Sequence, residues 1–235
     1  MVVLYIILGI LALAAAYCLW VILSSVFINT RKEYDVNSRY YRCVLYSATF
    51  LAVFFGRIKI EIRGKEQVPA GRFLLVSNHR SKFDPILTWH ILRRQDVAFI
   101  SKKENFSVPF FGRIIRKCCF MAIDRENPRA ALKTVERAAK LIQNDEVSVG
   151  VYPEGTRNYG EGLLPFHNGI FKIAQKAKVP IVVLKLTNTA QIQHNFPLRR
   201  THVVMDFKAV LSADEVRTMR TVEIGERVRA LLLEE

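Results

Sequence analysis

Cysteine is scarce in this chain, which has four cysteines in 235 residues, namely Cys18, Cys43, Cys118 and Cys119. Their spacing matches no zinc-binding pattern, and a bridge between the adjacent Cys118 and Cys119 would be strained. We therefore expect no metal site and no disulfide framework, but reduced thiols that are mostly buried. A nucleophilic cysteine is an alternative, although no motif places a histidine beside one of these thiols.

The sequence also lacks internal repeats, low-complexity tracts and interdomain linkers, so we expect one globular domain with a full hydrophobic core. The Gly-x-Ser-x-Gly elbow of many serine hydrolases is absent. No nucleic-acid-binding motif is present either, and a soluble nucleic-acid-binding protein would have no need of the apolar segment at the amino end.

Charged side chains are missing from residues 1–30, and residues 1–29 are long and apolar enough to span a bilayer. A cleaved signal peptide is a poorer explanation, because the segment lacks a basic start and exceeds the apolar core of a signal. A second apolar run, Val44–Phe55, has twelve residues and is too short to span. We expect it to lie at the membrane interface or to return beside the first helix.

Acidic residues are few relative to basic ones, and the formal net charge is +14. The excess is concentrated in residues 57–129, where sixteen Lys or Arg side chains outnumber seven Asp or Glu side chains. A basic surface attracts anionic lipids, phosphorylated substrates and acidic carrier proteins, and it could also attract nucleic acid. If the first helix spans, Arg31, Lys32, Arg39 and Arg42 place the rest of the chain on the cytoplasmic side of the membrane.

After residue 57 short apolar runs alternate with amphipathic segments, which predicts strands alternating with helices. Ile58–Ile62 has the pattern of a strand with one exposed face. Asn127-Pro128 begins a helix, and a charged helix is expected over residues 213–234, broken near Gly225. The other predicted strands are 73–76, 96–101, 120–123, 147–152, 181–187 and 202–210, and another helix covers about 168–178. This order predicts an α/β fold with a mostly parallel sheet flanked by helices.

A histidine and a carboxylate follow the first buried strand, at His79 and Asp84. Asp84-Pro85 is typical of a helix start, with Asp as the N-cap and Pro at the first helical position. His79 then lies on the strand-to-helix loop, at the strand end where open α/β sheets bind ligands. A carboxylate that holds one ring nitrogen makes the imidazole an effective general base. The alternative is that Asp84 only caps the helix and His79 is an ordinary loop residue.

A glycine and an arginine follow a second strand, in the segment Glu154-Gly155-Thr156-Arg157. Gly155 permits a positive φ or a close approach of the backbone to a ligand. Arg157 has the planar fork that suits a phosphate. The alternative is a surface turn with a solvated arginine, but two such loops at one expected edge favour a shared site.

Four ordered blocks within residues 58–187 resemble the glycerolipid acyltransferase family. The His-x4-Asp motif of that family is matched by His79 and Asp84, and its Glu-Gly-Thr-Arg motif by residues 154–157. An intervening block is matched by Lys102, Glu104, Pro109, Gly112 and Arg125, and a Val-Pro-Ile-Val block by residues 179–182. The departures are Cys119 for a common Gly, Asn105 for a Leu, His167-Asn168 for a Lys pair and Val183 for a second Pro.

The resemblance implies an O-acyltransferase that moves an acyl chain from acyl-CoA or acyl-carrier protein to the free hydroxyl of 1-acyl-glycerol-3-phosphate. His79 would be the base and Asp84 its orienting group. The expected substrate-binding residues are Glu154, Gly155, Thr156, Arg157, Lys102 and Arg125. No metal or bound cofactor is expected, because a thioester is already reactive. The expected partners are membrane lipids, a lysophospholipid acceptor and the thioester donor.

The resemblance also implies an N-terminal helical pair, so we expect a membrane-anchoring element over residues 1–56 and an acyltransferase domain over 57–235. Three other functions remain open. The protein could act on another lysolipid, it could be a membrane-bound serine hydrolase or thioesterase that uses Ser77 or Ser81, or it could bind lipid without catalysis.

Overall fold

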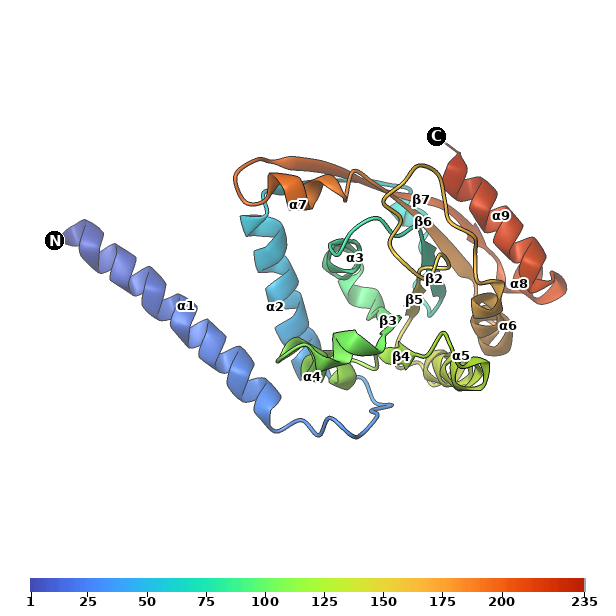
Figure 1. Ribbon diagram of the computed structural model, residues 1–235, viewed down its shortest axis with the longest axis horizontal. Coiled ribbons are helices and arrows are strands. Elements are labelled where there is room, and N and C mark those ends of the chain that lie inside the picture. Colours follow the sequence, from blue (N-terminus) through green and yellow to red (C-terminus); the bar gives the residue numbers. More distant parts are fainter. Residues whose placement is uncertain (235) are drawn as a thin grey trace.

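A computed structural model describes residues 1–234 and shows a seven-stranded sheet between two layers of helices (Figure 1). The strands are β1 (Ile58–Arg63), β2 (Leu74–Ser77), β3 (Ala98–Lys102), β4 (Met121–Ile123), β5 (Val149–Val151), β6 (Ile181–Thr187) and β7 (Thr201–Leu211). The helices are α1 (Val2–Val26), α2 (Arg39–Phe55), α3 (Asp84–Ile91), α4 (Phe111–Lys117), α5 (Pro128–Gln143), α6 (Lys172–Ala177), α7 (Gln191–Asn195), α8 (Ala213–Thr218) and α9 (Thr221–Leu233). Short 3-10 turns cover Lys65–Gln67 (η1), Arg93–Gln95 (η2), Lys103–Ser107 (η3) and Asn168–Phe171 (η4).

The strand order is β1-β7-β6-β2-β5-β3-β4. All neighbouring strands are parallel except β6 and β7, which are antiparallel. The predicted mostly parallel sheet is therefore confirmed. The central strands are largely apolar because both faces are covered, as in Leu74–Val76, where every side chain is buried.

The helices cover the two faces of the sheet as separate groups. Helices α2, α3 and α4 pack together on one side, while α5, α6, α8 and α9 pack on the other (Figure 1). Helix α5 begins where the sequence predicts, since the Asn127 side chain accepts hydrogen bonds from the backbone N–H groups of Arg129 and Ala130.

Two local predictions are wrong. Residue Asp84 begins α3 but is not its N-cap, which is Phe83, and the Asp84 carboxylate accepts N–H groups of the preceding loop instead. The terminal helix breaks between Thr218 and Thr221 rather than at Gly225, which lies buried inside α9. A Cβ on Gly225 would lie 2.1 Å from the side-chain oxygen of Asn168, so this glycine serves close packing rather than a break.

The backbone conformation at Cys119 accounts for the glycine that is common at this position in the family pattern. The backbone φ of Cys119 is +59°, in the left-handed region that favours glycine, so a glycine is the unstrained residue there. Cys118 and Cys119 are buried and free, as expected, but the equally free Cys18 and Cys43 are exposed, so only half of the thiols are buried. Burial raises the pKa of both Cys118 and Cys119 to about 12.

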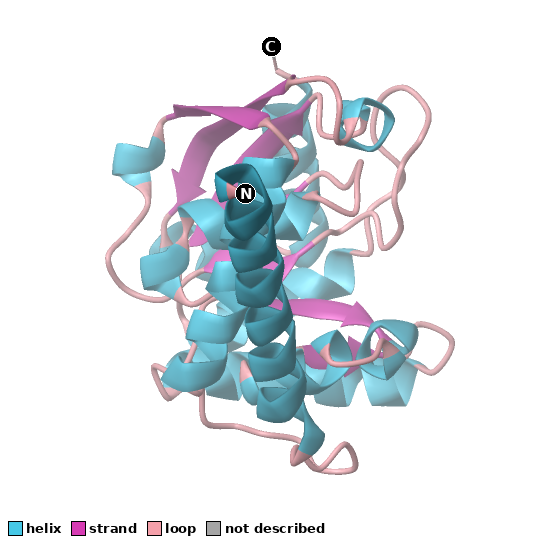
Figure 2. Cartoon of the chain, turned by 90° about the vertical axis from the view of Figure 1, so that its left-hand side faces the viewer, coloured by secondary structure: helices cyan, strands magenta, loops and turns pink. Residues whose placement is uncertain are grey.

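Helix α1 projects from the domain, and most of its apolar side chains are exposed; Figure 2 shows this helix in front of the sheet. It is long and apolar enough to cross a membrane, at about 1.5 Å per residue over 25 residues. Its carboxyl-terminal part contacts α2 through hydrogen bonds between the hydroxyls of Tyr17 and Ser47 at 2.9 Å and between those of Ser24 and Tyr40 at 2.6 Å. Part of the second apolar run therefore does return beside the first helix.

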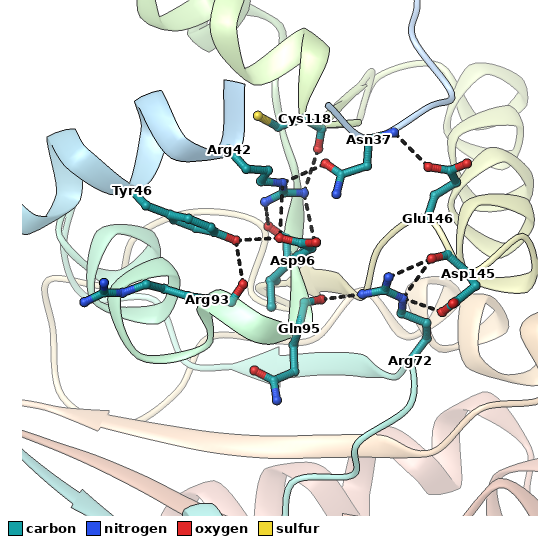
Figure 3. A network of polar contacts seen from close by, with 11 residues as sticks. Asn37, Arg42, Tyr46, Arg72, Arg93, Gln95, Asp96, Cys118, Asp145 and Glu146 are labelled. Atoms are coloured by element: carbon teal, nitrogen blue, oxygen red, sulfur yellow. Dashed lines mark hydrogen bonds and ion pairs between the residues drawn. The ribbon is translucent and has the colours of Figure 1, made fainter. Parts of the chain in front are cut away.

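Helix α2 belongs to the domain core as much as to α1. Arg42 is 2% exposed, and its guanidinium donates to the side chain of Asn37 and to the carbonyls of Asp96, Val97 and Cys118, at 2.8–2.9 Å (Figure 3). Val44 of the same helix lies in the main hydrophobic core. Helix α2 therefore packs on the domain as well as beside α1, and the Arg42 side chain is buried instead of lying on the surface.

Candidate active site

The loops that carry the predicted site residues meet at one edge of the sheet. Strands β6, β2, β5, β3 and β4 are parallel neighbours, so their carboxyl ends lie side by side. The loop after β2 carries His79, and the loop after β5 carries Glu154 to Arg157. Lys102 ends β3 and Arg125 follows β4, which places all the predicted residues at this edge.

His79 and Asp84 form the directly bonded pair that the spacing predicts. The imidazole Nδ1 lies 2.8 Å from Asp84 Oδ2. The same carboxylate oxygen accepts the backbone N–H groups of Arg80 and Ser81, each at 2.7 Å, and the Asp84 side chain is fully buried. Fixing Nδ1 in this way leaves Nε2 to accept a proton from a substrate, since His79 keeps 18% of its side chain exposed.

An aromatic stack holds the imidazole from one face. The His79 ring lies 4.0 Å from the Tyr152 ring with an interplanar angle of 12°, and Tyr152 stacks in turn on Phe99 at 5.2 Å. Burial raises the pKa of Tyr152 well above its usual range, and the charge of Asp84 adds to this effect. The phenol therefore stays neutral and supports one face of the His79 ring.

Glu154 joins the two loops. Its Oε1 accepts the backbone N–H of His79 at 2.9 Å, and its Oε2 accepts the backbone N–H of Leu164 at 2.9 Å. The backbone N–H of Asn158 donates to the His79 carbonyl at 2.8 Å, so the base is bracketed by two bonds from the second loop. Glu154 is 4% exposed, and both of its oxygens are used to position the loops.

The predicted basic residues line the rim of the same edge. A Cβ on Gly155, where φ is +73°, would lie 2.9 Å from His167 and 3.9 Å from the guanidinium carbon of Arg125. Arg157 is half-buried and its guanidinium lies 5.9 Å from the centroid of the Tyr159 ring. Thr156 and Lys102 are exposed.

The serines beside His79 have structural contacts. Ser77 donates to the Asn78 carbonyl, while the Ser81 hydroxyl accepts the backbone N–H of Phe83, and both serines are buried. Within the described chain neither hydroxyl is bonded to the imidazole, which disfavours a serine nucleophile. Asn78 bonds the N–H and C=O of Leu186 and so ties the loop to β6.

Two cavities lie near the residues that contact His79. One of about 390 Å³ is lined by apolar side chains, with Tyr152, Gly155 and Arg125 among its other walls. A second, more polar cavity of about 350 Å³ lies over the end of β6 and is lined by Asn78 and Arg80. His79 lines neither cavity, but Tyr152, on which its ring stacks, lines the first, and its chain neighbours Asn78 and Arg80 line the second.

The structure thus bonds His79 both to Asp84 and to Glu154, and it places Gly155 close to Arg125. The sequence reasoning missed the stacking role of Tyr152 and the tether at Asn78. Asn78 directly precedes the His-x4-Asp motif and Tyr152 lies two residues before the Glu-Gly-Thr-Arg motif, and an aromatic residue at the end of a buried strand was the available signal for Tyr152. No group of three or more His, Cys, Asp or Glu side chains in residues 1–234 is arranged to hold a metal.

Residues 59–186 match the model of the Acyltransferase family, which is more than half of the chain. The chain therefore belongs to the Acyltransferase family, and the bonded pair His79 and Asp84 lies within the matched residues.

Several curated relatives carry one name. The 1-acyl-sn-glycerol-3-phosphate acyltransferase of Haemophilus influenzae is 34% identical over 146 residues, covering 59% of this chain and 60% of that protein. The protein of the same name from Salmonella typhimurium is 29% identical over 183 residues, covering 77% of this chain and 74% of that protein. The crystal structure of the 1-acyl-sn-glycerophosphate (LPA) acyltransferase PlsC from Thermotoga maritima matches with a TM-score of 0.65 and 22% identity, over 93% of this chain and 90% of that one.

Proposed function

We propose that the protein transfers an acyl chain from an acyl thioester to the free hydroxyl of 1-acyl-glycerol-3-phosphate, which yields phosphatidic acid. The observation that carries the proposal is the 2.8 Å contact between His79 Nδ1 and the buried Asp84 carboxylate. The name shared by the curated relatives supports the choice of acceptor.

The base acts in two proton transfers. His79 Nε2 removes the proton of the acceptor hydroxyl as its oxygen attacks the thioester carbonyl carbon. The tetrahedral intermediate then expels the thiolate, and the imidazolium returns the proton to that sulfur. Asp84 stabilises the imidazolium between the two transfers. A thioester is already activated, so positioning and one base suffice without a metal or bound cofactor.

The acceptor's phosphate is held by Arg157, with Lys102 and Arg125 as further cations at the same edge. The apolar cavity beside Gly155 suits the chain of an amphiphile whose anionic end lies near Arg125. Gly155 and Thr156 shape the loop, and Glu154 fixes its position against His79. Acyl-CoA and acyl-carrier protein both present phosphate or acidic groups to this basic edge.

The enzyme is held at the membrane by α1, and the domain lies on the cytoplasmic side. The apolar length of α1 and the basic residues Arg31, Lys32 and Arg39 that follow it support this orientation. Arg42 contributes to the domain instead, because it is buried.

The test is an assay of purified protein in detergent, with acyl-CoA and acyl-carrier-protein donors offered against a panel of lysolipids. We expect transfer to 1-acyl-glycerol-3-phosphate that is abolished in His79→Ala. Transfer only to lysolipids without a free phosphate would contradict the proposed acceptor. A burst of acyl-enzyme formation would contradict direct attack and favour a covalent mechanism.

A further inference from the structure

The amino ends of β1 and β7 lie at the same edge of the sheet as the active-site loops. Strands β1 and β7 are parallel, with Ile58 beside Thr201. Strand β7 is antiparallel to β6, with Val204 beside Thr187 at the carboxyl end of β6. The chain therefore brings the end of α2, which leads into β1, and residues 196–200, which lead into β7, to the edge that carries His79.

These two segments are bonded to each other. The guanidinium of Arg57 donates to the Leu198 carbonyl at 2.8 Å, and the Thr201 N–H donates to the Arg57 carbonyl at 3.3 Å. Figure 1 shows the turn between α7 and β7 beside the end of α2. We name the surface formed by Phe54, Phe55, Arg57 and residues 196–200 the edge patch.

The edge patch combines exposed apolar side chains with unpaired cations. The exposed fractions are 65% for Phe54, 60% for Phe55 and 81% for Leu198. Arg57, Arg199 and Arg200 are also exposed, and none of them is in an ion pair with another residue of the described chain. Large apolar side chains beside arginines are typical of surfaces that insert at the boundary between anionic head groups and acyl chains.

We propose that the edge patch docks on an anionic bilayer surface and holds the active-site edge against the lipid. The occupant follows from charge complementarity and from continuity with α2, whose partner α1 is the apolar membrane helix. The contact itself depends only on the patch. Its consequence, direct access of a membrane-held acceptor to His79, rests on the proposed function.

Contact is tested with the full chain in vesicles of phosphatidylcholine and phosphatidylglycerol that carry brominated acyl chains. The Leu198→Trp variant places a fluorophore on the edge patch, and Val222→Trp places one on α9 at a site that is 49% exposed. The native Trp20 and Trp89 contribute the same background fluorescence to both variants. We expect the added fluorescence at 198, but not at 222, to be quenched by the brominated lipid. An unquenched, water-exposed signal at 198 would refute the contact.

The consequence is tested by the kinetics of Arg199→Glu/Arg200→Glu, with Lys133→Glu/Lys140→Glu on α5 as a control of equal charge change. In anionic vesicles the first variant should raise the apparent KM for the acceptor about tenfold or more, and the control much less. In detergent both should match the parent. Equal effects of the two variants in vesicles would overturn the docking role. Absence of transfer by the parent in detergent would instead reject the proposed function.

Discussion

Replacing Asp84 by Asn should lower kcat about 10²–10⁴-fold while the protein stays folded. The carboxylate Oδ2 accepts three hydrogen bonds, whereas Oδ1 is buried without a partner among the described residues. An asparagine can place its amide oxygen at the position of Oδ2 and its NH₂ group at that of Oδ1. The loop bonds are then kept, and the loss is the negative charge that stabilises the imidazolium of His79.

The Asp84→Ala variant separates this role from the structural one. Alanine leaves the buried N–H groups of Arg80 and Ser81 without an acceptor, at a cost of about 1–3 kcal/mol each in the free energy of unfolding. We therefore expect a lower melting temperature for Asp84→Ala than for Asp84→Asn, with a comparable loss of kcat. Thermal unfolding and steady-state kinetics in detergent measure both quantities.

The decisive measurement is a double-mutant cycle with His79→Ala. If Asp84 acts through His79, Asp84→Asn should cause no further loss of kcat in the His79→Ala background. Full additivity of the two losses would refute the reasoning, and so would a folded Asp84→Asn protein that retains kcat within a factor of about three.

Three further variants or conditions test the rest of the structure. Arg157→Lys keeps the charge but loses the fork, so KM should rise for the phosphorylated acceptor and change little for the donor, and the reverse pattern would assign Arg157 to the donor's phosphates. Arg42→Met removes the buried donor to three backbone carbonyls and should lower the free energy of unfolding by about 3–5 kcal/mol in chemical denaturation, whereas Arg39→Met, at an exposed site, should have little effect. Folding raises the pKa of Cys118 and Cys119 from 9.0 to about 12, so their contribution to the free energy of unfolding is full below pH 9 and is lost as the pH rises towards 12. In Cys118→Ala/Cys119→Ala this loss of unfolding free energy between pH 9 and 12 should be smaller, as measured by chemical denaturation at a series of pH values.

The edge that carries the site could be predicted because it depends on chain order. Buried strands joined by helices become parallel neighbours, so the residues after Val76 and after Val151 must lie at the same edge. The pairing of His79 with Asp84 also needs only a short loop between a strand and a helix. The shared edge follows from the order of strands and helices, and the pairing of His79 with Asp84 follows from their short spacing, so both could be predicted from the sequence.

The remaining contacts join segments that are far apart in the sequence. Glu154 bonds a backbone group 75 residues away, and Arg42 bonds carbonyls 54–76 residues away. A charged side chain is expected to be exposed, and only the arrangement of facing carbonyls makes the burial of Arg42 favourable. The break in the terminal helix was misplaced for the same reason, since the packing partner of Gly225 is η4, which is distant in the sequence.

Glu154 takes part in no proton transfer of the proposed mechanism. The hydrogen bonds around His79 nevertheless show why a carboxylate stands at this position. A general base must be held within reach of its proton, and loops are less rigid than strands. One Glu154 oxygen holds the backbone of His79, while the other holds Leu164, ten residues further along the second loop. Together with the bond from Asn158 N–H to the His79 carbonyl, this fixes the second loop against the first. Because Arg157 is carried by that second loop, the same contacts that immobilise the base also set the place of the proposed phosphate ligand. His79, Glu154 and the loop that carries Arg157 are thus joined by hydrogen bonds across two strands, which is the kind of arrangement that a reaction relying on positioning requires.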